Sequence, residues 1–148
     1  MIEDDVVKDD VFATDERVTL RFAPFWVLAA FAGRQRGFDQ SEFEAFSRVI
    51  EEASERARGR LGGRVLQRVA MDLDRIAAAF GNDRRSVATG LYEVRGLIER
   101  LPPDEALAFR ETLVCGVGEG IAKARGRYGR IISEEDGRTL ELVEALLS

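Results

Sequence analysis

The sequence predicts a single all-α domain, a compact bundle of about six helices. Three observations lead to this prediction. The chain has 148 residues, which is enough to enclose one hydrophobic core. No stretch shows the sustained period-two alternation of β-branched residues that is typical of strands. Instead, apolar residues repeat at steps of three and four, and each stripe ends after two or three turns, as in bundle helices and unlike a coiled coil.

The first predicted helix contains residues 22–33, which are apolar on nearly every side. A helix of this kind must be enclosed by other helices. Pro24 lies at its start or inside it, so the proline either opens the helix or kinks it after a short helical turn over residues 15–22. The second helix carries the apolar stripe Phe43, Phe46, Ile50, Ala53 and Ala57.

Glycine, asparagine and proline mark the boundaries of the later helices. A glycine cluster within residues 59–63 separates the second helix from the third, and the turn at residues 81–83 follows the third. Residues 102–103, both proline, end the fourth helix and begin the fifth, where Asp104 and Glu105 suit the helix dipole. The stripes of the third, fourth and last helices are Leu66, Val69, Leu73, Ile76 and Phe80; Val87, Leu91, Val94, Ile98 and Leu101; and Leu140, Val143 and Leu147.

Two segments read as copies of one helix–turn–helix unit. In each, an apolar helix is followed by a polar turn and by a second helix that begins with a capping residue. The capping residues are Asp39 and Ser133, and each is followed three positions later by an acid, Glu42 or Asp136, as in a capping box. We therefore expect the two hairpins to be related by an internal pseudo-twofold axis.

Small residues predict a close helix crossing at the centre of the bundle. Gly116 and Gly120 lie one turn apart in the fifth helix and leave one face bare, and Ala29 and Gly33 offer a matching strip on the first. Each interior glycine costs about 1 kcal/mol relative to alanine, so close packing must offset that cost. The glycines do not have the spacing of a nucleotide-binding loop, and no strand precedes them.

Composition excludes several kinds of active site. The chain has no histidine and one cysteine, which excludes histidine-dependent catalysis, histidine metal sites and an intramolecular disulfide. Cys115 falls on an apolar helix, so we expect a buried, unreactive thiol. No activated nucleophile accompanies the carboxylates, so we expect no enzymatic activity. The longest apolar run is too short to span a membrane and the first residues are acidic, so we expect a cytoplasmic protein.

Charge is distributed unevenly along a chain whose formal net charge is −5. Residues 1–10 contain five acids and one lysine, and we expect a disordered acidic tail over residues 1–12, followed by one domain over residues 13–148. Two basic stretches lie at residues 56–68 and 123–130, and solvated helix ends and turns explain both. Nucleic-acid binding by the first stretch is a further hypothesis, which the negative net charge disfavours.

The repeated unit resembles the tellurite-resistance TerB family over residues 22–148. The resemblance is strongest at residues 23–32 with 38–42, and at residues 120–124 with 132–136. It implies a compact all-helical domain with an internal pseudo-twofold, in a stress-response or tellurite-resistance context and without enzymatic activity. It also implies that acidic residues at the two turns bind a divalent cation.

The chain departs from the family pattern at both turns. Gln35 and Gly129 stand where the family has aspartate, and arginines near each turn would repel a cation. We therefore expect an interaction scaffold that binds another protein or itself through its arginine-rich turns and its acidic tail. The alternative is a module that binds a divalent cation such as calcium or magnesium. Its ligands would be the helix-start carboxylates of both repeats, Asp39, Glu42, Glu135 and Asp136, although helix capping also explains these acids.

Overall fold

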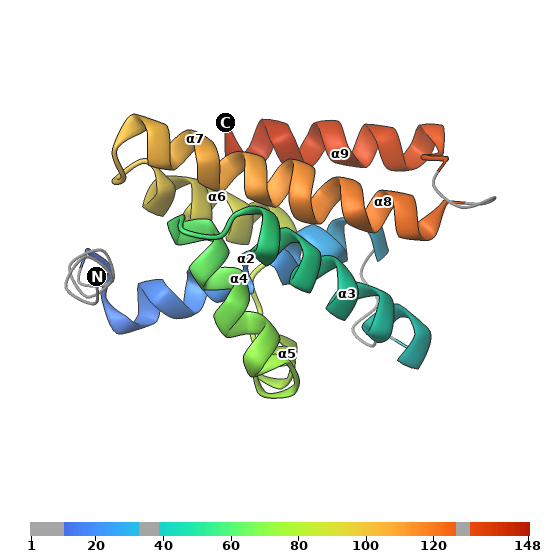
Figure 1. Ribbon diagram of the computed structural model, residues 1–148, viewed down its shortest axis with the longest axis horizontal. Coiled ribbons are helices and arrows are strands. Elements are labelled where there is room, and N and C mark those ends of the chain that lie inside the picture. Colours follow the sequence, from blue (N-terminus) through green and yellow to red (C-terminus); the bar gives the residue numbers. More distant parts are fainter. Residues whose placement is uncertain (1–10, 33–38, 127–130) are drawn as a thin grey trace.

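The secondary structure of the described residues is entirely helical, which confirms the predicted all-α fold. The computed structural model describes residues 11–32, 39–126 and 131–148. In chain order the elements are α2 (Thr14–Ala32), α3 (Gln40–Arg56), α4 (Leu61–Met71), α5 (Leu73–Gly81), α6 (Val87–Ile98), α7 (Pro103–Glu111), the π-helix η1 (Thr112–Gly118), α8 (Glu119–Arg125) and α9 (Glu134–Leu147) (Figure 1).

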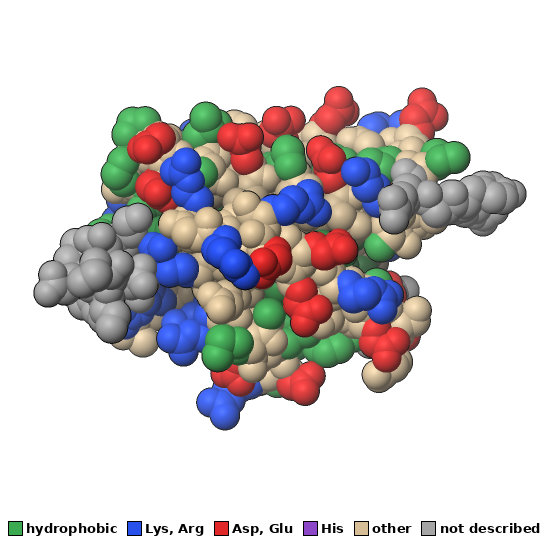
Figure 2. Space-filling model, in the orientation of Figure 1, with side chains coloured by type: hydrophobic (Ala, Val, Ile, Leu, Met, Phe, Trp, Pro, Cys, Tyr) green, Lys and Arg blue, Asp and Glu red, His purple; other side chains and the backbone are tan. Residues whose placement is uncertain are grey.

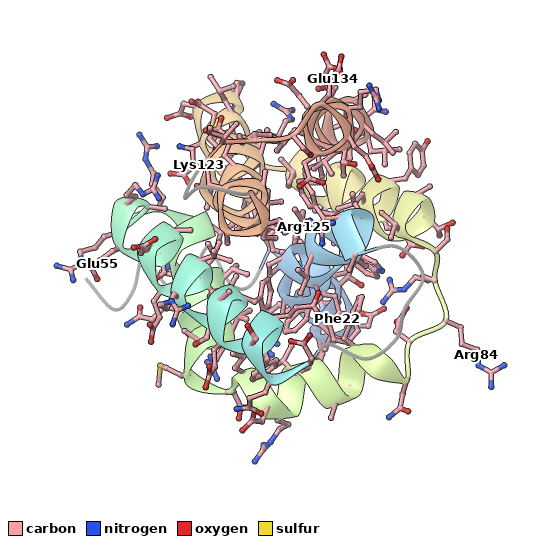
Figure 3. The ribbon with its side chains drawn as sticks, turned by 90° about the vertical axis from the view of Figure 1, so that its right-hand side faces the viewer. Phe22, Glu55, Arg84, Lys123, Arg125 and Glu134 are labelled. Atoms are coloured by element: carbon pink, nitrogen blue, oxygen red, sulfur yellow. The ribbon has the colours of Figure 1, made fainter. Side chains whose placement is uncertain are left out.

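Helix α2 lies at the centre of the bundle, as its apolar sequence predicts. Every side chain from residue 22 to residue 28 is buried, and the helix packs against α4, α5, α6, η1, α8 and α9. Figure 3 looks nearly along α2 and shows the other helices around it. The helix begins at Thr14 and continues through Pro24, so the proline does not open it. Packing on all sides compensates for the backbone hydrogen bond that the proline cannot donate.

The predicted third helix forms two separate helices, because the helical conformation is interrupted at Asp72. This residue has φ −133° and ψ 37° and ends α4 while beginning α5. Aspartate is a poor residue for a helix interior, since its side chain competes for backbone hydrogen bonds. The apolar stripe keeps its helical spacing across the break, so periodicity alone could not reveal it. The predicted boundaries at Gly81 and Pro103 are confirmed, whereas Gly62 and Gly63 of the predicted glycine boundary lie inside α4.

The predicted fifth helix is the continuous segment formed by α7, η1 and α8, and its glycines do not face the helix that we expected. A Cβ atom on Gly116 would lie 3.1 Å from the Ala53 Cβ atom, and one on Gly120 would lie 2.8 Å from Val49 Cγ1. Both neighbours belong to α3. The prediction that these glycines face Ala29 and Gly33 of the first helix is therefore wrong. The π-helical turn at η1 changes the angular spacing of side chains, which helical periodicity does not anticipate.

The two repeated units share their caps but not their packing. In the second unit, α9 lies along η1 and α8, as expected for a hairpin. In the first unit, α2 and α3 touch through the rings of Phe25 and Phe46, whose centroids lie 5.1 Å apart, but α3 packs mainly against α4, η1 and α8. The turn from α3 to α4 contains Gly59 with φ +87°, a left-handed conformation that favours glycine and brings these two helices together.

The folded part of the chain begins earlier than the predicted boundary at residue 13. Phe12 is only 4% exposed and belongs to the core. The Arg100 guanidinium lies 5.2 Å from its ring centroid and also donates a hydrogen bond to the Val11 carbonyl. The remaining tail residues 1–10 lie outside the described residues, as do Gly33, Gln35 and Gly129.

Candidate functional site

The acids at the start of α3 form a complete capping box, as predicted. Asp39 Oδ1 accepts a hydrogen bond from the Glu42 N–H at 2.8 Å, and Glu42 Oε1 accepts one from the Asp39 N–H at 3.2 Å. Each carboxylate therefore satisfies a backbone donor that the first turn of a helix leaves unpaired. Both candidate cation ligands of the first repeat thus have a structural use in this helix.

The acids at the start of α9 differ from each other in their surroundings. The N-cap Ser133 accepts a hydrogen bond from the Asp136 N–H at 3.1 Å. The Asp136 side chain is 9% exposed, and its Oδ2 accepts a hydrogen bond from Arg125 Nε at 3.3 Å. Glu135 is exposed. The guanidinium of Arg125 thus supplies a positive charge at the place where the second repeat would hold a cation.

The structure does not bring the four candidate cation ligands into one cluster. Helices α3 and α9 both begin at the right-hand end of the molecule in Figure 1, but Figure 3 shows the two starts on opposite sides of that end. Among the residues that the structure describes, no group of three or more His, Cys, Asp or Glu side chains is arranged to hold a metal ion. The two capping motifs therefore act separately.

The arginines of the basic stretch over residues 56–68 lie in two different environments. Arg58 donates to Glu55 at 2.6 Å, and Arg60 donates to Glu105 at 3.3 Å. These two arginines therefore belong to ion pairs on the surface. Arg64 and Arg68 lie on α4 itself and line a groove against the first part of α2.

This groove has a volume of about 560 Å³, and arginines from two helices surround it. Within each helix the two arginines are four residues apart, which places both on one face. Figure 2 shows Lys and Arg side chains gathered over the start of α2 and over α4, on the left of the view. None of the described residues that line the groove is acidic. We call it the arginine groove; its arginines are Arg17, Arg21, Arg64 and Arg68.

The remaining lining of the arginine groove is largely apolar. Phe12, Leu20 and Leu61 are buried beneath it, and Val65 is half-buried. Met71 is 77% exposed, the largest exposed fraction among the exposed large hydrophobic residues of the described chain. An exposed thioether beside several guanidinium groups offers both apolar contact and positive charge to a ligand.

Arg100 holds the residues at the start of α2 in place, at one end of the arginine groove. Its guanidinium donates to Glu16 Oε2 at 2.8 Å, in addition to its contacts with Val11 and Phe12. The hydrogen bond from Arg100 lowers the pKa of the Glu16 carboxyl, and the bond from the Ala13 N–H acts in the same direction. The first turn of α2 is thus held against the loop between α6 and α7.

A second hollow, of about 460 Å³, lies between α3 and α4, and its lining carries charges of both signs. Glutamates and arginines both line it, so opposite charges balance across a short distance. Its charged lining residues are Glu51, Glu52, Glu55, Arg58 and Arg64. A ligand of either sign would meet repulsion there, which makes the arginine groove the better candidate for recognition.

Cys115 is exposed, so the prediction of a buried thiol is wrong. The π-helical turn that contains it explains this error, because it alters which positions face the core. Partial burial raises the pKa of the thiol, and the nearby carboxylates of Glu119, Glu111 and Glu144 raise it further. A thiol that stays protonated at neutral pH is a poor nucleophile.

Sequence reasoning missed half of the arginine groove. Arg17 and Arg21 lie on α2, 47 residues before their counterparts on α4, whereas a basic stretch is recognised only from neighbours in sequence. Their spacing of four on the polar side of the first helix is a usable signal. What the spacing does not show is which other helix lies beside that face.

No protein-family model, curated protein or solved structure gives a significant match to this chain. The resemblance to the TerB family therefore stays a prediction. Within the described part of the chain, no helix combines the length and the apolar character needed to cross a membrane.

Proposed function

We propose that this chain is a non-enzymatic interaction module that binds peptide segments of partner proteins in the arginine groove. The segments would combine acidic and apolar side chains. The observation that supports this proposal is the groove itself, where four arginines surround an apolar floor without an acid among the described lining residues. Guanidinium groups recognise carboxylates through paired hydrogen bonds, while Met71 and the half-buried Val65 offer apolar area that a ligand can cover.

An acidic–apolar peptide suits this surface better than a nucleic acid does. A phosphate backbone would use the arginines but would leave Met71 and the half-buried Val65 without apolar partners. The net charge of −5 also repels a long polyanion. A short peptide experiences mainly the local field, because charges more than about 8 Å away are screened at physiological salt.

The proposal keeps the interaction-scaffold hypothesis and assigns it a surface. The stress-response or tellurite-resistance setting remains a prediction from the TerB resemblance alone. The divalent-cation alternative has no support from the described geometry, since Asp136 pairs with Arg125 and since Asp39 and Glu42 cap α3.

The test is a binding titration with a defined probe. The probe peptide is a fluorescein-labelled ten-residue peptide in which glutamate and leucine alternate, and fluorescence anisotropy reports its Kd. We expect Arg68→Gln to weaken binding about fivefold, since an ion pair at an exposed position contributes up to about 1 kcal/mol. Met71→Ser should weaken it as well, by removing apolar contact.

Arg84→Gln is the matched control, because it removes the same charge outside the groove. Figure 3 shows Arg84 pointing away from the molecule. Its substitution should leave the Kd unchanged. Equal weakening by Arg84→Gln and Arg68→Gln would show only a net-charge effect and would contradict the proposal. Tight binding of a duplex oligonucleotide, with a steep salt dependence and no effect of Met71→Ser, would replace it with nucleic-acid binding.

A further inference from the structure

We propose that residues 1–10 of this chain occupy the arginine groove in cis and compete with partner peptides. This inference rests on the proposed function, because it concerns regulation of the same site. The segment has the chemistry of the proposed ligand class, since apolar residues alternate with groups of acids and Lys8 alone opposes them. Its acids are Glu3, Asp4, Asp5, Asp9 and Asp10, and its apolar residues are Met1, Ile2, Val6 and Val7.

The described residues that directly follow this segment lie at the groove. Phe12 and Thr14 line the groove, and Arg100 holds Val11 and Phe12 in place. Residue 10 is therefore joined to the chain at the edge of the groove. Ten extended residues span at most about 35 Å. Helix α4 has 11 residues and is about 16 Å long, so the segment can reach every arginine that lines the groove.

A short tether makes even weak binding effective. A segment attached beside its site has an effective concentration on the order of 1 mM. If its intrinsic Kd is about 0.1 mM, it fills the groove most of the time and weakens binding of a competing peptide about tenfold. A partner with several contacts, or one at high local concentration, would then displace it.

The experiment compares the full chain with a full-length variant in which the leading acids are neutralised. The substitutions are Glu3→Gln, Asp4→Asn, Asp5→Asn, Asp9→Asn and Asp10→Asn. The same glutamate–leucine probe peptide is titrated into each at 150 mM salt. We expect the neutralised variant to bind the probe about tenfold more tightly than the full chain. Lys8→Gln is the matched control with opposite sign, since it makes the segment more acidic and should weaken probe binding.

The outcomes separate this inference from the proposed function. If both proteins bind the probe with the same Kd and Arg68→Gln weakens both, the groove binds peptides but the cis inference is overturned. If neither protein binds, the proposed function fails and the inference fails with it. A difference that grows with protein concentration would assign the segment to the groove of a second copy, which also overturns occupancy in cis.

Hydrogen exchange provides a second measurement that needs no added ligand. Occupancy of the groove predicts slower exchange of the backbone amides over residues 64–71 in the full chain than in the neutralised variant. Residues 134–147 of α9, which do not line the groove, provide the internal reference. Identical exchange over residues 64–71 in the two proteins would contradict the inference.

Discussion

At the scale of single residues, Trp26 and Gly90 show how closely the core is fitted. The Trp26 side chain is 1% exposed, and a Cβ atom built on Gly90 would lie 2.1 Å from its Cε2 atom. The Arg85 guanidinium covers the indole at 4.8 Å from the ring centroid. The ring is thus held between a cation and the bare backbone of α6, and it has little freedom to move away.

Gly90→Ala is therefore expected to destabilise the protein by about 3 kcal/mol, at the upper end of the usual cost of overpacking. Gly96 lies in the same helix, and a Cβ atom there would meet nothing within 4 Å. Gly96→Ala should instead stabilise the protein by about 0.5–1 kcal/mol, because alanine favours the helix. Urea unfolding of both variants measures the two effects. A loss of stability in both would show that helix α6 does not tolerate alanine for reasons other than Trp26.

At the scale of elements, Arg85 joins the loop between α5 and α6 to two helices. Its guanidinium donates to Asp83 Oδ2 at 2.7 Å, to Glu93 Oε1 at 2.7 Å and to Thr19 Oγ1 at 3.0 Å. The hydrogen bonds from Arg85 lower the pKa of the Asp83 carboxyl, although partial burial opposes them. Asp83 and Glu93 in turn raise the pKa of Arg85, although partial burial opposes them.

The lowered pKa of Asp83 predicts a pH-dependent contribution to stability. A carboxyl with a lower pKa in the folded state stabilises the fold above its unfolded pKa, about 3.9, and loses that contribution as pH falls through the folded value. We expect Asp83→Asn to cost about 1–2 kcal/mol at pH 7, and this cost to shrink steadily below about pH 4. Chemical unfolding across this pH range measures it. In an Arg85→Gln background the pH dependence due to Asp83 should disappear, and its persistence would assign it to another group.

At the scale of the whole molecule, the sequence predicts local features well and long-range ones poorly. The capping box of Asp39 and Glu42 depends on four consecutive residues, and the structure confirms it. Residues 22–28 are apolar on every side of their helix, and this local pattern predicts that the helix is central. The break at Asp72 leaves the apolar spacing unchanged, and the π-helical turn at residues 112–118 alters which positions face the core without a signal in the sequence, so periodicity reveals neither.

The arginine groove could not be predicted because it depends on which helices become neighbours. Arg17 and Arg68 belong to helices that pack together only in the folded chain. A sequence shows that each arginine lies on a polar face, but the partner of that face follows from the packing of the whole core. The same dependence on long-range packing applies to the candidate cation ligands. Their two capping motifs lie at one end of the molecule and do not form one cluster.

The response of the whole molecule to divalent cations tests the remaining alternative. Asp136 already pairs with Arg125, so a cation would have to displace a guanidinium from a side chain that is 9% exposed. We therefore expect the chelator-treated protein to melt at the same temperature with and without millimolar calcium, magnesium or manganese. An ion at about one hundred times its Kd would add about 2.7 kcal/mol and shift the melting temperature by several degrees. Such a shift, abolished by Asp136→Asn but retained in Asp74→Asn, would establish cation binding at α9 and contradict this expectation.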